Sequence, residues 1–132
     1  MSGVILTLLT LLLAADGPLY DDRTADGLIR QATESSYNMH LDQARAAARD
    51  LQTKFPDHPA GYTIMAETYW WEAQSDPHNK TIEDAYYRAQ EIAVQKAEAA
   101  LKTGKYTKFE ILAYLASAHG SYARFQVTQK DA

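Results

Sequence analysis

The stretch that most restricts the fold of this chain is residues 41–71, which predicts two helices joined by a turn between prolines. In its first half, apolar residues recur every three or four positions and therefore share one side of a helix. They are Leu41, Ala44, Ala47, Ala48 and Leu51. Pro56 ends this pattern, because the residue before a proline is disfavoured in the α region. Pro59 suits the first position of the second helix, where its missing N–H is harmless. Alanine dominates the first stripe, so we expect another helix to approach it closely.

The same three-and-four spacing predicts further helices on both sides of this unit. We expect helices at about 25–38, 41–54, 59–74, 82–103 and from 108 to about 125. Thr24 and Thr81 are the expected N-terminal caps, and Gly104 is the expected C-terminal stop. The T-x-x-E pattern of Thr107 and Glu110 predicts a capping box at the start of the last helix. No segment alternates with period two, so the predicted fold class is all-α.

Composition excludes several classes of function. At 132 residues the chain is one domain's worth. It has no cysteine, which excludes disulfides, thiolate metal sites and a cysteine nucleophile. The formal net charge is −4 and the basic residues form no run, so no nucleic-acid footprint is visible. We expect no cofactor.

The N-terminus predicts where the protein acts. Val4 to Leu13 is a ten-residue apolar run followed by two alanines, which fits a signal peptide over residues 1–15. The run is shorter than the roughly 20 residues that a membrane-spanning helix needs, so we expect no integral membrane span. Export to the periplasm or the extracellular space follows if the signal is real, and a cytoplasmic location if residues 1–15 form a buried helix instead. Residues 16–23, rich in Gly, Pro and Asp, are expected to be a linker.

The central stretch resembles the tetratricopeptide repeat. Ala32 and Ala66 lie 34 positions apart, which is about the period of that family. The family's W-x2-L-G-x2-Y positions are matched by residues of similar type, namely Tyr62, Met65, Ala66 and Tyr69, with Pro56 as the preceding closing proline. The match is weaker outside residues 41–71. The resemblance implies antiparallel helical hairpins stacked as a short α-solenoid over residues 24–132, with about two full hairpins and a further helix.

The resemblance also implies a concave binding face formed by the first helix of each hairpin. Carried over by position, the partner-binding residues are Thr33, Tyr37, Thr63, Glu67, Trp70 and Trp71. Trp and Tyr are favoured anchors at protein interfaces. Adjacent residues point about 100° apart on a helix, so we expect at least one of the two tryptophans to be used in packing. The predicted function is a non-enzymatic scaffold that binds a protein or peptide partner.

Two other functions remain open from the sequence. One is a small enzyme or metal site between helices that pairs Glu67 with His58 or His119. The four histidines have no i,i+4 pair and no H-E-x-x-H, so surface or capping roles are expected and no metal is assigned. The other is a structural domain that forms a homo-oligomer through exposed end helices, because the last segment, residues 127–132, lacks a polar closing helix.

Overall fold

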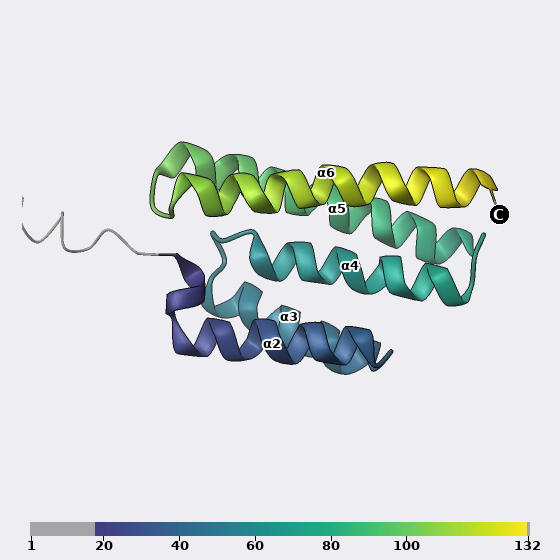
Figure 1. Ribbon diagram of the computed structural model, residues 1–132, viewed down its shortest axis with the longest axis horizontal. Coiled ribbons are helices and arrows are strands. Elements are labelled where there is room, and N and C mark those ends of the chain that lie inside the picture. Colours follow the sequence, from purple (N-terminus) through teal and green to yellow (C-terminus); the bar gives the residue numbers. More distant parts are fainter. Residues whose placement is uncertain (1–17, 132) are drawn as a thin grey trace, which may run out of the picture.

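The computed structural model describes residues 18–131, which form one short 3₁₀ helix and five α-helices (Figure 1). The elements are η1 (Leu19–Asp21), α2 (Arg23–Tyr37), α3 (Leu41–Lys54), α4 (Ala60–Ser75), α5 (Lys80–Thr103) and α6 (Lys108–Asp131). No strand occurs in this part of the chain, so the all-α prediction is confirmed. The predicted signal peptide lies outside the described residues. Within them, no helix has the length and hydropathy that a membrane crossing requires.

The five helices lie in two layers. Figure 1 shows α2, α4 and α6 side by side in front, with α3 and α5 behind them. Each helix packs against the next one in the chain, and α4 also contacts both α2 and α6. Helices α2 and α6 make no close backbone contact with each other, so α4 separates them. Side chains of all three helices line one cavity, so α4 is the floor of a groove whose walls are α2 and α6.

The first four predicted helices are close to those observed, but α6 continues about six residues past its predicted end near residue 125, and two caps are wrong. Asp22 caps α2 by accepting from the N–H groups of Thr24 and Ala25, and Asn79 caps α5 in the same way from Thr81 and Ile82. Thr24 and Thr81 are therefore donors within the first turn and not the caps. The true caps lie two residues earlier, because a cap must precede the first helical residue to reach its free N–H groups. Gly104 ends α5 with a φ of +66°, as predicted.

The contact between α3 and α4 depends on small residues. Ala44, Ala47 and Ala48 are buried on α3. A Cβ atom added to Gly61 would lie 2.9 Å from the Ala48 carbonyl oxygen and 2.9 Å from the Gln52 backbone nitrogen. Real Cβ atoms are not found so close to backbone atoms, so only glycine allows this separation. The alanine stripe of α3 therefore has a close neighbour, as expected, and that neighbour is α4.

A second set of contacts fixes α6 on α5. The Tyr86 ring stacks on Phe125 with centroids 4.0 Å apart, and its hydroxyl hydrogen-bonds to the Ser121 hydroxyl at 2.9 Å. The Gln90 side-chain amide donates to the Ala118 carbonyl. These buried contacts set the rotation of α6 about its axis, and so decide which of its residues face the groove.

Candidate functional site

The groove between α2, α4 and α6 contains a cavity of about 320 Å³. All three helices contribute side chains to its lining: Thr33, Ser36 and Tyr37 from α2, Glu67, Trp70 and Trp71 from α4, and Ser117, Ser121 and Arg124 from α6. Five of the six residues predicted at the concave face therefore lie together. The sixth, Thr63, does not line the cavity. Its side chain is buried, and its hydroxyl donates to the Pro59 carbonyl at 3.0 Å.

Three aromatic rings form one wall of the cavity. The Tyr37 and Trp71 rings have centroids 5.6 Å apart, and the Trp70 and Trp71 rings meet nearly edge-on at 4.9 Å. Trp70 also packs against the buried cluster that contains Tyr86 and Phe125. The expectation that one tryptophan is used in packing therefore fits Trp70, although that residue lines the cavity as well. Trp70 Nε1 is buried without a hydrogen-bond partner in the described chain.

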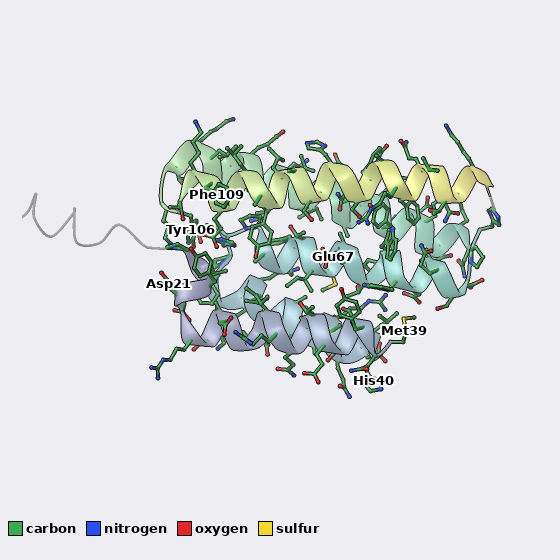
Figure 2. The ribbon with its side chains drawn as sticks, in the orientation of Figure 1. Asp21, Met39, His40, Glu67, Tyr106 and Phe109 are labelled. Atoms are coloured by element: carbon green, nitrogen blue, oxygen red, sulfur yellow. The ribbon has the colours of Figure 1, made fainter. Side chains whose placement is uncertain are left out.

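The cavity contains two opposite charges that do not form an ion pair. Figure 2 shows Glu67 near the middle of α4, where burial raises the pKa of its carboxyl and the charge of Arg124 partly opposes that rise. Within residues 18–131, the Glu67 carboxylate receives no hydrogen bond and has no cationic nitrogen within 4.0 Å. The Arg124 guanidinium carbon lies 5.7 Å from the centre of the Trp70 ring instead.

A second cluster of ionisable groups lies at the end of the bundle where η1 is found. His58 is fully buried there. Its Nδ1 accepts the Ala60 N–H at 3.0 Å, which places the ring proton on Nε2. Nε2 lies 3.2 Å from Glu110 Oε1, without the alignment of a hydrogen bond. Burial lowers the pKa of His58 to about 4, so the ring is neutral. The expectation of a surface or capping role is therefore met by capping, at a buried position.

Glu110 connects this cluster to the start of the described chain. Its two carboxylate oxygens accept the buried Leu19 N–H at 2.9 and 3.1 Å. Burial raises the pKa of Glu110, while hydrogen bonds from the Leu19 N–H and the Thr107 hydroxyl lower it. The predicted capping box is therefore incomplete, because the carboxylate is directed to η1. Part of the expected linker folds as η1 and buries Leu19 against the helices.

Asp57 joins two turns at the same end of the molecule. It accepts hydrogen bonds from the Tyr106 hydroxyl at 2.7 Å and from Lys105 Nζ at 2.9 Å. Burial alone would raise the pKa of Asp57, but these two bonds outweigh it and the pKa is lowered. Figure 2 shows Tyr106 close to Asp21, and both residues line a cavity of about 570 Å³ beside η1. The groups of this cluster already bind one another, so we assign it a structural role.

The structure does not bring Glu67 together with a histidine. His58 faces Glu110, and His119 lines a separate cavity of about 520 Å³ between α5 and α6. His40 and His78 are exposed in turns. Among the residues that the structure describes, no three His, Asp or Glu side chains are placed to hold a metal ion.

Sequence reasoning missed the wall of the groove that α6 contributes. Ser117, Ser121 and Arg124 follow one another at spacings of four and three, which is a polar stripe on one side of that helix. That spacing was the available signal, but it does not say what the stripe faces. The candidate site is thus a polar and aromatic groove, and the carboxylate at its floor has no partner among residues 18–131. No family model matches this chain, and no curated protein or solved structure matches it either.

Proposed function

We propose that this chain is a non-enzymatic binding module of the tetratricopeptide type, whose groove between α2 and α6 holds a segment of another polypeptide. The observation that carries the proposal is the convergence of three helices on one cavity with an aromatic wall. Aromatic side chains offer large contact area at little loss of side-chain entropy. A cavity of about 320 Å³ suits one or two side chains of a bound peptide.

The order of the helices supports the repeat interpretation. Alternate helices, α2, α4 and α6, share the front layer, and the helices between them share the back layer (Figure 1). Stacked helical hairpins place their first helices on one face in this way. The 34-residue spacing of Ala32 and Ala66 puts equivalent residues on successive front helices. In this proposal the groove is the concave face.

Selection of peptides from a random display library tests the proposal. Enriched peptides, labelled with a fluorophore, are titrated with the purified chain and with the Trp71→Ala and Tyr37→Ala variants. We expect each variant to weaken binding by about tenfold, because an interface aromatic residue contributes on the order of 1–2 kcal/mol or more. Circular dichroism should show unchanged helicity, since Tyr37 is 71% exposed and Trp71 is half-buried.

Tyr20→Ala is the matched control. Tyr20 is an exposed aromatic residue on η1 and does not line the groove. Its removal should leave peptide affinity unchanged. Peptides that bind the Trp71 and Tyr37 variants as well as they bind the unchanged chain would contradict the proposal.

A second candidate function, self-association, is favoured by the outer face of α6. Apolar or small residues recur along this face and all are exposed: Phe109, Leu112, Ala113, Ala116, Gly120, Ala123 and Val127. Six of these seven residues are symmetric about Ala118, with Phe109 matched by Val127, Ala113 by Ala123 and Ala116 by Gly120, whereas Leu112 is matched by Arg124. Two copies of α6 packed antiparallel would therefore meet the same pattern from either side, as a two-fold interface requires.

Sedimentation equilibrium separates this candidate from the first. A dimer that Ala116→Glu converts to monomer would support self-association through α6, and a monomer at all concentrations would remove it. Ala99→Glu, on the exposed side of α5, is the control for added charge.

Export from the cytoplasm is proposed on the apolar run of residues 4–13 alone. Amino-terminal sequencing of the protein purified from its own cells tests it. A mature chain that begins near Asp16 would support export, and a chain that retains Met1 would contradict it.

A further inference from the structure

We infer that the groove is built for an alkylammonium group, with Glu67 as its counter-ion and the rings of Tyr37, Trp70 and Trp71 as its walls. Such a group is the end of a lysine side chain or the amino terminus of a peptide. The inference rests on the proposed function, because it names the chemistry by which the groove recognises a polypeptide.

The first argument is the state of Glu67. Its carboxylate is at the floor of the groove and has no hydrogen-bond or ion-pair partner within residues 18–131. A partly buried charge without a partner is unfavourable, and proteins normally pair such groups. Burial also raises the pKa of Glu67, because removing water disfavours the ionised form of the carboxyl. A cation in contact with the carboxylate would stabilise its ionised form.

The second argument is the arrangement of the rings. The faces of Trp and Tyr rings attract cations, and the attraction grows when water is excluded. Tyr37 and Trp71 are tilted at 56° to each other, and Trp70 and Trp71 stand at 87°. The three rings are therefore not stacked in parallel, and all three line the cavity together with Glu67.

The remaining polar groups of the cavity suit an ammonium group attached to a peptide. An ammonium group has three donors. Apart from Glu67, the hydroxyl groups of Thr33 and Ser117 line the cavity and make no other hydrogen bond in the described chain. The Trp70 Nε1–H has no acceptor in the described part of the chain, and a peptide carbonyl can supply one. One peptide therefore brings both the donors and the acceptor that the cavity lacks.

Arg124 decides the sign of the charge that the groove prefers. Among the described residues that line the cavity it is the only other charged one, and it is exposed whereas Glu67 is half-buried. Its guanidinium lies over the Trp70 ring, where it competes with a bound cation for the same face. A cationic ligand should therefore bind better without Arg124, and an anionic ligand should bind worse.

The experiment uses the chain's only two tryptophans, both of which line the cavity. Their two indole N–H signals in nuclear magnetic resonance spectra report on the groove directly. The full chain is titrated with Nα-acetyl-lysine methylamide, with its uncharged analogue Nα-acetyl-norleucine methylamide, and with alanine methylamide, whose only amine is at its amino terminus. Whichever amine binds more tightly names the source of the ammonium group.

We expect the lysine or the amino-terminal probe to shift the indole signals at a concentration about tenfold lower than the norleucine probe does, because a charge-assisted contact is gained. Glu67→Gln keeps the shape of the side chain and should remove this preference. Arg124→Gln should tighten binding of the cationic probe several-fold. Unchanged positions of the other amide signals show that both variants fold.

Three results would overturn the inference. The first is equal binding of the charged and uncharged probes, and the second is no shift of either indole signal by any amine. The third is weaker binding of the cationic probe to Arg124→Gln. In each case the proposed function can still stand, because library-selected peptides would still depend on Trp71 and Tyr37. Loss of that dependence is the separate result that removes the proposed function.

Discussion

Glu67 and Glu110 lie on α4 and α6, two helices of the front layer, but their surroundings differ. Burial raises the pKa of both Glu67 and Glu110. Glu110 accepts the Leu19 N–H with both oxygens and lies beside His58. Glu67 has no hydrogen bond in the described chain and feels only the more distant charge of Arg124. A buried glutamate is therefore not by itself a binding site. Glu110 is already hydrogen-bonded within the fold, whereas Glu67 has no such partner among the described residues.

The largest expected effect comes from removing the paired glutamate. Glu110→Ala leaves the buried Leu19 N–H without its carboxylate acceptor, so we expect the free energy of unfolding to fall by about 2–3 kcal/mol. Urea unfolding followed by circular dichroism measures the loss. Glu67→Ala is the comparison and should cost far less. Equal losses for the two variants would remove the distinction between the clusters.

The pH dependence of stability tests the cluster beside η1 through the protonation of His58. The pKa of His58 is about 4 in the folded chain and about 6.5 when unfolded, so the unfolded state alone takes up a proton between these values. Stability is therefore lost as pH falls from about 6.5 to about 4, by roughly 2–3 kcal/mol in total. Glu110, whose pKa is raised, acts in the opposite direction, and the rings of Tyr106 and Tyr114 also face the imidazole.

His58→Asn isolates the histidine in that measurement. The asparagine side-chain oxygen can accept the Ala60 N–H in place of Nδ1 but does not titrate. The difference in unfolding free energy between the two proteins should thus change across pH 4 to 6.5. A difference that is constant over this range would show that His58 is not held neutral.

At the groove, Glu67→Gln should raise stability. Because the folded pKa of Glu67 is raised, its ionised form is disfavoured in the folded chain at neutral pH. Removing the charge should stabilise the fold by on the order of 1 kcal/mol, and the gain should disappear as pH falls and the native carboxyl becomes protonated. Thermal melts at neutral and acidic pH test this. A loss of stability at neutral pH would mean that Glu67 has a partner after all.

The smallest effect is expected from Asp57→Asn. This residue joins the turn after α3 to the turn after α5 through Lys105 and Tyr106, but the Asp57 and Lys105 side chains are 47% and 44% exposed. Exposed ion pairs contribute about 0–1 kcal/mol because water and salt screen them. We expect a loss in this range that shrinks in high salt, as urea unfolding at two salt concentrations would show. A larger loss would place Asp57 among the essential contacts of that end.

The sequence was a good guide to the helices and a partial guide to the groove. The helix starting at Leu41 and ending at Lys54 was predicted to the residue, because apolar spacing and Pro56 both act locally. The caps were misplaced by two residues at Asp22 and Asn79, where several cap-forming residues stand close together. Five groove residues followed from the repeat resemblance. Arg124 did not, because the resemblance is weak at the C-terminal end.

By itself, then, the sequence determined where the helices run, because helical periodicity and turn chemistry depend on residues a few positions apart. Only the tertiary structure decided which buried charges have partners. Glu110 meets the N–H of Leu19, which is 91 positions away in the chain, and no local pattern records that contact. Within residues 18–131 Glu67 has no partner, because α2 and α6 lie apart on either side of α4. A buried charge is paired only if its partner lies close in space, and the packing of the helices sets that distance.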